Sequence, residues 1–276
     1  MPAVRDAILR VIDNPNLLLD CGHASTWESR EDYVKLVETV FDKTKKDKDG
    51  RLQADDGVVV ATARTTQIRL GFRPARVKKP ADMNDVRNKV LATKAAWLPT
   101  ATAVLFARSA EFKAVCDRIE KTPVPDGQFE ANPFHSVPKL VEAVAKKLKV
   151  SEEAAGFYLQ VLALPEPTTA NIKIWNDWKP AAIKNVVAEL TKKKLLLEAK
   201  RARAGRNYFV PGGWEPLDRP YLPIETWKLT MFGIDRGDEH LSMPLPRIVC
   251  PRPVHQQFEL AWQRVLDGDE PAYEEV

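Results

Sequence analysis

Four basic residues lie within seven positions in the second half of the chain, around a single glycine. They are Lys200, Arg201, Arg203 and Arg206, and the glycine is Gly205. Lys and Arg side chains on a short turn can contact the phosphates that border the minor groove of DNA. A turn that serves solubility alone usually mixes both signs of charge. The cluster therefore predicts contact with nucleic acid.

The surrounding charge is strongly divided along the chain. Residues 131–210 carry 14 Lys and Arg against 7 Asp and Glu, whereas residues 211–276 carry 6 against 12. A basic element beside an acidic extension is typical of an anion-binding surface. The acidic extension could also cover the basic turn within the same chain.

Periodicity and turn residues place the basic turn at the tip of a hairpin that follows several helices. Ser136, Ser151 and Thr168 or Thr169 are suited to cap helices over 137–148, 151–164 and 170–177. Pro180 favours the first turn of a further helix over 180–193. That helix would bury one apolar stripe, which consists of Ile183, Val186, Val187 and Leu190. The runs Leu195–Leu197 and Tyr208–Val210 predict the two strands of the hairpin.

This order of elements over residues 136–213 resembles the winged helix-turn-helix superfamily. The features that match are the helix pair 169–178 and 180–193, the leucine run, and a wing over Lys200–Arg206. The resemblance implies that helix 180–193 enters the major groove of double-stranded DNA. Lys184 and Asn185 would then read bases, because Lys can reach guanine and Asn can pair with adenine. Lys179 and Lys192 would be further contacts beside the four basic residues of the wing.

The remaining sequence predicts an α+β protein of three parts. Residues 1–125 form a small mixed domain of unknown role, 134–214 the winged helix, and 215–276 an acidic extension packed on it through tryptophans. The Pro-rich segment 121–133 is the expected linker. In the first domain, Ser29 and Asp32 suggest a capping box. The elements expected there are helices over 4–12, 29–42, 84–96 and 110–120, and strands over 58–60, 68–72 and 102–107.

The chain lacks the common catalytic signatures. No G-x-G dinucleotide fingerprint, phosphate-binding loop or G-x-S-x-G elbow is present, so we expect neither an enzyme nor a cofactor. Cys21 with His23, and Cys250 with His255, lack the paired spacing of a zinc site, so no metal is expected. Three cysteines and the lack of a signal segment favour the cytoplasm, and no apolar run is long enough for a membrane span. We expect a bacterial protein.

Two functions remain open at this stage. The first is a regulatory DNA-binding protein that holds phosphates with its wing. The second is a non-enzymatic adaptor or assembly component that uses the winged helix to dock a protein. The segment 220–232 (PYLPIETWKLTMF), or residues 1–125, would then contact that partner. The helix face is poor in arginine, which favours the second function.

Overall fold

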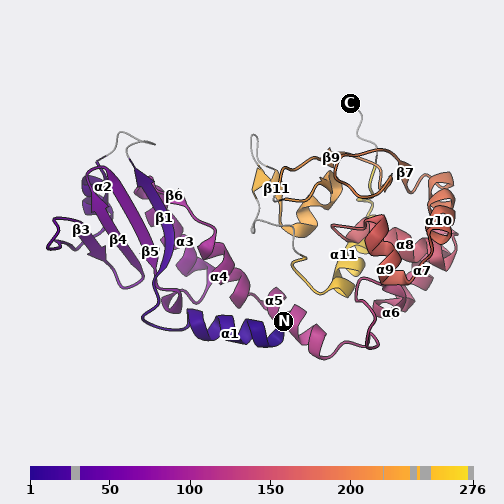
Figure 1. Ribbon diagram of the computed structural model, residues 1–276, viewed down its shortest axis with the longest axis horizontal. Coiled ribbons are helices and arrows are strands. Elements are labelled where there is room, and N and C mark those ends of the chain that lie inside the picture. Colours follow the sequence, from indigo (N-terminus) through magenta and orange to yellow (C-terminus); the bar gives the residue numbers. More distant parts are fainter. Residues whose placement is uncertain (26–31, 220, 237–240, 243–249, 273–276) are drawn as a thin grey trace. The chain divides into compact units, whose positions relative to one another are not determined.

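The computed structural model describes residues 1–25, 32–219, 221–236, 241–242 and 250–272 (Figure 1). It confirms the predicted α+β class. The chain divides into two compact units, Met1–Cys116 and Asp117–Val276. The sequence placed the linker at 121–133, whereas the division falls inside the helix α5 (Ala110–Glu120). Arg118 pairs with Glu130 at 2.8 Å, so the Pro-rich segment is tied to the second unit.

The first unit is built around a six-stranded antiparallel sheet with the strand order β2-β3-β4-β5-β1-β6. The strands are β1 (Leu19–Ser25), β2 (Thr44–Lys46), β3 (Leu52–Asp55), β4 (Val59–Arg64), β5 (Gln67–Phe72) and β6 (Ala96–Trp97). The helices are α1 (Pro2–Ile12), α2 (Tyr33–Val40), η1 (Pro74–Arg76), α3 (Pro80–Ala92), α4 (Thr100–Arg108) and the first part of α5.

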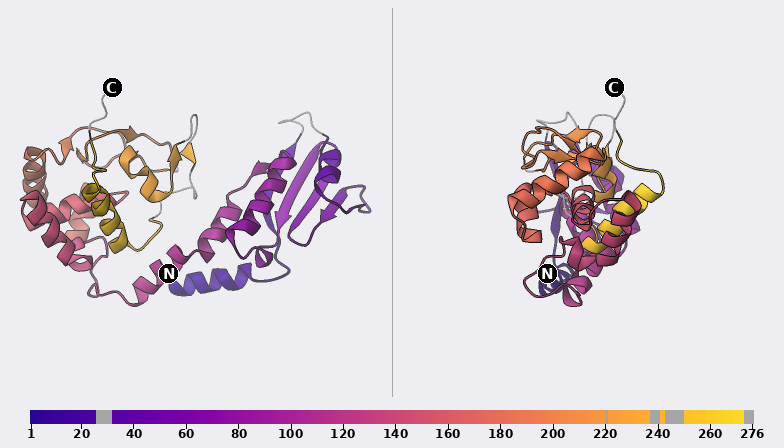
Figure 2. Two further views of the ribbon diagram at one scale, coloured as in Figure 1. Left: turned by 180° about the vertical axis from the view of Figure 1, so that it is seen from behind. Right: turned by 90° about the vertical axis from the view of Figure 1, so that its right-hand side faces the viewer.

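One face of this sheet is covered and the other is open. Buried residues alternate with exposed or half-buried ones along β3 and β4, as expected for strands with one face in a core. The buried side chains pack with α2, α3 and α4 in one apolar core. Helix α3 lies behind the sheet in Figure 1 and in front of it in the left view of Figure 2.

Several sequence predictions for the first unit are wrong. Residues 102–107, predicted as a strand, belong to the helix α4, where Ala101, Val104 and Ala107 are buried at helical spacing. A short apolar run has no periodicity that separates a buried strand from a buried helix. The helix predicted over 84–96 begins earlier, with Pro80 in its first turn, and ends at Ala92. Asp32 caps α2, and the proposed partner Ser29 lies outside the described residues.

The second unit holds a helical core with short strands around it. Its helices are α6 (Pro133–Ser136), α7 (Pro138–Leu148), α8 (Glu152–Ala163), α9 (Thr169–Asn176), α10 (Pro180–Lys192), η2 (Thr226–Phe232) and α11 (Val254–Leu266). The strands form three two-stranded ribbons, which are β7 (Leu197–Glu198) with β8 (Tyr208–Phe209), β9 (Trp214–Glu215) with β10 (Ile224–Glu225), and β11 (Asp235–Arg236) with β12 (Leu241–Ser242).

Helix α8 is the centre of this unit. Its residues from Ala154 to Ala163 are all buried, as expected of a helix with neighbours on every side. One apolar core joins α8 to α7, α9 and α10, and also to η2 and α11 from the acidic extension. Gln160 is the polar residue at this centre, and its amide exchanges two hydrogen bonds of 2.9 Å with Asn176.

Two of the predicted helix caps are confirmed and one is wrong. Ser151 caps α8 and Thr168 caps α9, each by accepting a hydrogen bond from a backbone N–H. The prediction that Ser136 caps α7 is wrong, because Ser136 ends the short helix α6 and its hydroxyl donates to the carbonyl of Asn132. The strand predicted at Leu195–Leu197 begins only at Leu197.

Candidate nucleic-acid interface

A tight corner between α9 and α10 fixes the direction of α10. Asp177 ends α9 in the left-handed conformation, with φ of 53°. Trp178 then stacks on Phe157 of α8, with ring centroids 6.3 Å apart and planes 12° from parallel. Pro180 occupies the first turn of α10, as the sequence predicted. The corner is therefore anchored to the most buried helix of the unit.

Helix α10 has a buried face and a basic exposed face. The predicted apolar stripe Ile183, Val186, Val187 and Leu190 is buried, so the opposite face is open to solvent. Lys184, Asn185 and Lys192 lie there, and Lys179 is exposed at the N-cap position. None of these lysines forms an ion pair with a described residue. Four of the eight predicted contacts thus share one helix.

The acidic residue of α10 does not neutralise this face. Glu189 accepts hydrogen bonds of 2.7 Å from the backbone N–H and from the hydroxyl of Ser151, at the start of α8. Its carboxylate stabilises the N-terminus of that helix, where a negative charge is favoured. The positive charge of Lys184 and Lys192 is left facing solvent.

Arg206, which the sequence predicted to contact DNA, is buried. Its side chain is only 2% exposed, and its guanidinium lies 2.6 Å from a carboxylate oxygen of Glu225, which is itself buried. Glu225 is also 3.0 Å from the ammonium of Lys228, and that ammonium donates to the carbonyl of Leu164 at 2.8 Å. A guanidinium enclosed in this way has no surface to offer a phosphate.

Within this buried cluster of Arg206, Glu225 and Lys228, the pKa values of Glu225 and Lys228 are shifted. Burial acts to raise the pKa of Glu225, but the charges of Lys228 and Arg206 outweigh it and hold that pKa below its usual range. Burial lowers the pKa of Lys228 to about 8, although the Glu225 charge opposes the change. The carboxylate of Glu225 thus links the hairpin to the extension.

The other two arginines of the hairpin also bind within the chain. Arg201 lies over the rings of Phe209 and Trp214, at 4.5 and 5.1 Å from their centroids, and it donates to the carbonyl of Gly212 at 3.2 Å. Arg203 is exposed, but its guanidinium donates to the carbonyls of Leu217 and Tyr221. These carbonyl acceptors are neutral, so Arg203 keeps its charge at the surface.

The tip of the hairpin packs against the start of α9. A Cβ atom at Gly205 would lie 2.9 Å from Cγ2 of Thr168, and the carbonyl of Gly205 accepts from the backbone N–H of Thr169 at 3.1 Å. Gly205 also has a φ of +67°, which glycine adopts without strain. Lys200, on the same hairpin, is exposed. Six of the eight predicted contacts are therefore exposed, and Arg203 is one of them. The three arginines of the hairpin, including Arg203, make contacts within the chain.

Two exposed lysines were not among the predicted contacts, and one segment predicted to lie against a partner packs partly in the core of its own unit. Lys193 and Lys194 follow α10 and are also exposed, and their adjacency to Lys192 could have indicated them. The segment 220–232, expected to lie against a partner, contributes Ile224, Leu229, Met231 and Phe232 to the core of its own unit.

Comparisons with protein-family models, with curated proteins and with solved structures find no match for this chain. Among the described residues, no helix is long and apolar enough to cross a membrane. The same part of the chain holds no cluster of His, Cys, Asp or Glu arranged to bind a metal ion.

Proposed function

We propose that the second unit binds double-stranded DNA as a winged helix-turn-helix domain, with α10 against the major groove. The observation that carries the proposal is the exposed face of α10, on which Lys184, Asn185 and Lys192 lie opposite a buried apolar stripe. The order of α8, α9 and α10 followed by the β7–β8 hairpin supports the same assignment.

Phosphate contacts supply most of the affinity in this proposal. Lysine ammonium groups act as point charges that release counterions from the duplex, whereas Asn185 has the geometry to pair with adenine. Ala181 and Ala188 are exposed on the same face and are small enough to contact a thymine methyl group. With one base-reading amide, binding resembles non-specific association, with a Kd on the order of 10⁻⁴ to 10⁻⁶ M at physiological salt.

The test measures duplex affinity against salt concentration for the full chain and for Lys184→Ala/Lys192→Ala/Lys200→Ala. Three lost phosphate contacts flatten the slope of log K against log salt by up to about 2.7, at roughly 0.9 for each contact. These side chains are exposed, so the variant retains the native fold.

A matched control removes the same charge from the first unit, through Lys35→Ala/Lys43→Ala/Lys48→Ala, whose side chains are exposed. The control keeps the slope of the native chain. An equal loss in both variants, or no duplex binding by the native chain at low salt, would falsify the proposal.

One observation favours protein docking as the second candidate. Ile174 on α9 is 61% exposed, although it is a large apolar residue beside the helix that carries the lysines. An adaptor would use this side chain at the centre of a contact. In that case Ile174→Ser abolishes capture of the partner, whereas it leaves duplex affinity unchanged if the proposal above is correct.

A further inference from the structure

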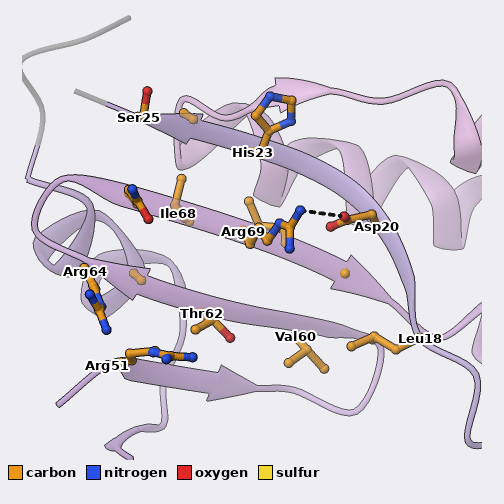
Figure 3. Close-up of a pocket in the computed structure, with 15 residues that line it drawn as sticks. Leu18, Asp20, His23, Ser25, Arg51, Val60, Thr62, Arg64, Ile68 and Arg69 are labelled. Carbon is orange, nitrogen blue, oxygen red and sulfur yellow. Dashed lines mark ion pairs between the residues drawn. The ribbon is translucent and has the colours of Figure 1, made fainter. Parts of the chain in front are cut away.

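The open face of the sheet in the first unit forms a hollow lined by basic and polar side chains (Figure 3). The basic lining residues are Arg51, Arg64, Arg69 and His23, and the acidic one is Asp20. Thr62, Ser25 and Gln67 add neutral hydrogen-bonding groups. The hollow extends over β3, β4, β5 and β1, so it is a broad surface rather than an enclosed cavity.

The strand register places the three arginines on the same face, with Arg51 beside Arg64 and Arg69 diagonal to Arg64. Leu52 is registered with Ala63, so Arg51 and Arg64 occupy the next pair of neighbouring positions, as Figure 3 shows. Arg64 is registered with Gln67 on β5, and Arg69 lies two residues further on the same face. Diagonal neighbours of this kind have Cα atoms about 7–8 Å apart. Two arginines side by side repel each other unless an anion lies between them.

The carboxylates nearby compensate this charge only weakly. Arg51 lies 3.3 Å from Asp49 and Arg69 lies 3.7 Å from Asp20, and in both pairs the side chains are about half exposed or more. Ion pairs open to solvent contribute little to stability, so a phosphate can displace them. Arg64 forms no ion pair with a described residue. The face is therefore complementary to a polyanion.

We propose that this face binds the backbone of single-stranded nucleic acid, with Arg51, Arg64 and Arg69 as its phosphate contacts. The width of the sheet argues against its entry into the undeformed major groove of a duplex. Six strands about 4.8 Å apart span roughly 24 Å, whereas the major groove of B-DNA is about 12 Å wide. A single strand lies across an open sheet without that restriction.

The lining residues determine what kind of single strand is bound. None of the described residues that line the hollow is aromatic, so these residues offer guanidinium planes for stacking, which tolerate every base. Thr62, Ser25 and Gln67 lie beside the arginines and can hydrogen-bond to phosphate or sugar oxygens. Binding is therefore independent of sequence and sensitive to salt.

The test measures the binding of fluorescein-labelled oligodeoxythymidine by fluorescence anisotropy over a range of salt concentrations. The protein is the full chain with Lys184→Ala/Lys192→Ala/Lys200→Ala, so that α10 does not contribute. Adding Arg51→Ala/Arg64→Ala/Arg69→Ala flattens the slope of log K against log salt by up to about 2, at roughly 0.7 for each contact with a single strand.

A matched control removes three exposed arginines from elsewhere in the first unit, through Arg10→Ala/Arg76→Ala/Arg87→Ala. It keeps the full slope, because these residues lie on α1, η1 and α3 rather than on the open face. An unchanged slope in the sheet variant, or the same loss in the control, overturns the inference. Tighter binding of polyglutamate than of the oligonucleotide also overturns it, because the partner is then an acidic protein. Duplex binding by α10 is measured separately and can fail without affecting this result.

Discussion

The buried cluster of Arg206, Glu225 and Lys228 gives a prediction about stability that can be worked from its charges. All three side chains are at most 2% exposed, and one carboxylate lies between two cations. Glu225→Gln keeps the shape of the side chain but leaves both cations buried without a counter-charge. Removing one partner from a buried ion pair costs about 3–5 kcal/mol. We expect Glu225→Gln to destabilise the second unit by at least that amount.

Lys228→Met is predicted to cost less, although it also removes a buried charge. Arg206 and Glu225 then remain as a balanced pair, 2.6 Å apart. The main loss is the donor to the carbonyl of Leu164, and an unsatisfied buried acceptor costs about 1–3 kcal/mol. In the variant Glu225→Gln/Lys228→Met, only Arg206 is left as an uncompensated buried cation. The free energy of unfolding therefore falls by less than the sum of the two single losses.

Urea denaturation followed by tryptophan fluorescence measures these differences. Trp175, Trp178, Trp214, Trp227 and Trp262 all belong to the second unit, so the signal reports mainly on it. Glu225→Gln lowers the urea midpoint by about 1–5 M, given the usual dependence of unfolding free energy on urea concentration. The charge argument is refuted if Lys228→Met lowers the midpoint as much as Glu225→Gln, or if the double variant shows the sum of both shifts.

Two further predictions concern the cores of the two units. Gly156→Ala destabilises the second unit by about 1–3 kcal/mol through overpacking, because the new Cβ would overlap the ring of Phe134 at Cζ. This cost exceeds the helix preference for alanine. Phe134→Leu in the same chain restores part of the urea midpoint, and no restoration would contradict the steric explanation. Burial, with a smaller effect of Asp20, raises the pKa of the Cys21 thiol from 9.0 to about 12. Between these values the unfolded chain has lost a proton that the folded chain keeps, so the first unit loses stability as pH rises from 9. Cys21→Ala removes this part of the decline in unfolding experiments followed by circular dichroism, and an identical decline in both proteins would show that the thiol does not cause it.

The sequence predicted correctly those features that depend only on residues close together in the chain. Ser151 and Thr168 were identified as caps because a side-chain oxygen satisfies a nearby N–H, and Pro180 because its fixed φ suits a first helical turn. The apolar stripe of α10 followed from spacing. These features need no knowledge of distant residues.

The failures share a dependence on distant partners. Arg206 looks like its neighbours Arg201 and Arg203 in sequence, and only Glu225, 19 positions later, decides that it is buried. The arginines of the open sheet face escaped notice because they belong to three different segments, which the strand register joins. The helix α4 was predicted as a strand because its run of apolar residues was judged without the elements that pack around it.

The link from Leu164 through Lys228 and Glu225 to Arg206 has a consequence for folding during synthesis. A ribosome delivers α8 and the hairpin before the residues that complete them, since Lys228 follows Leu164 by 64 positions. Until then Arg206 has no buried carboxylate, and the core lacks Phe258 and Trp262 of α11. Residues 136–213 therefore do not fold as an independent module in the order in which they emerge. The nascent second unit exposes part of its apolar core until α11 has been synthesised, and this interval is when it most needs protection from aggregation.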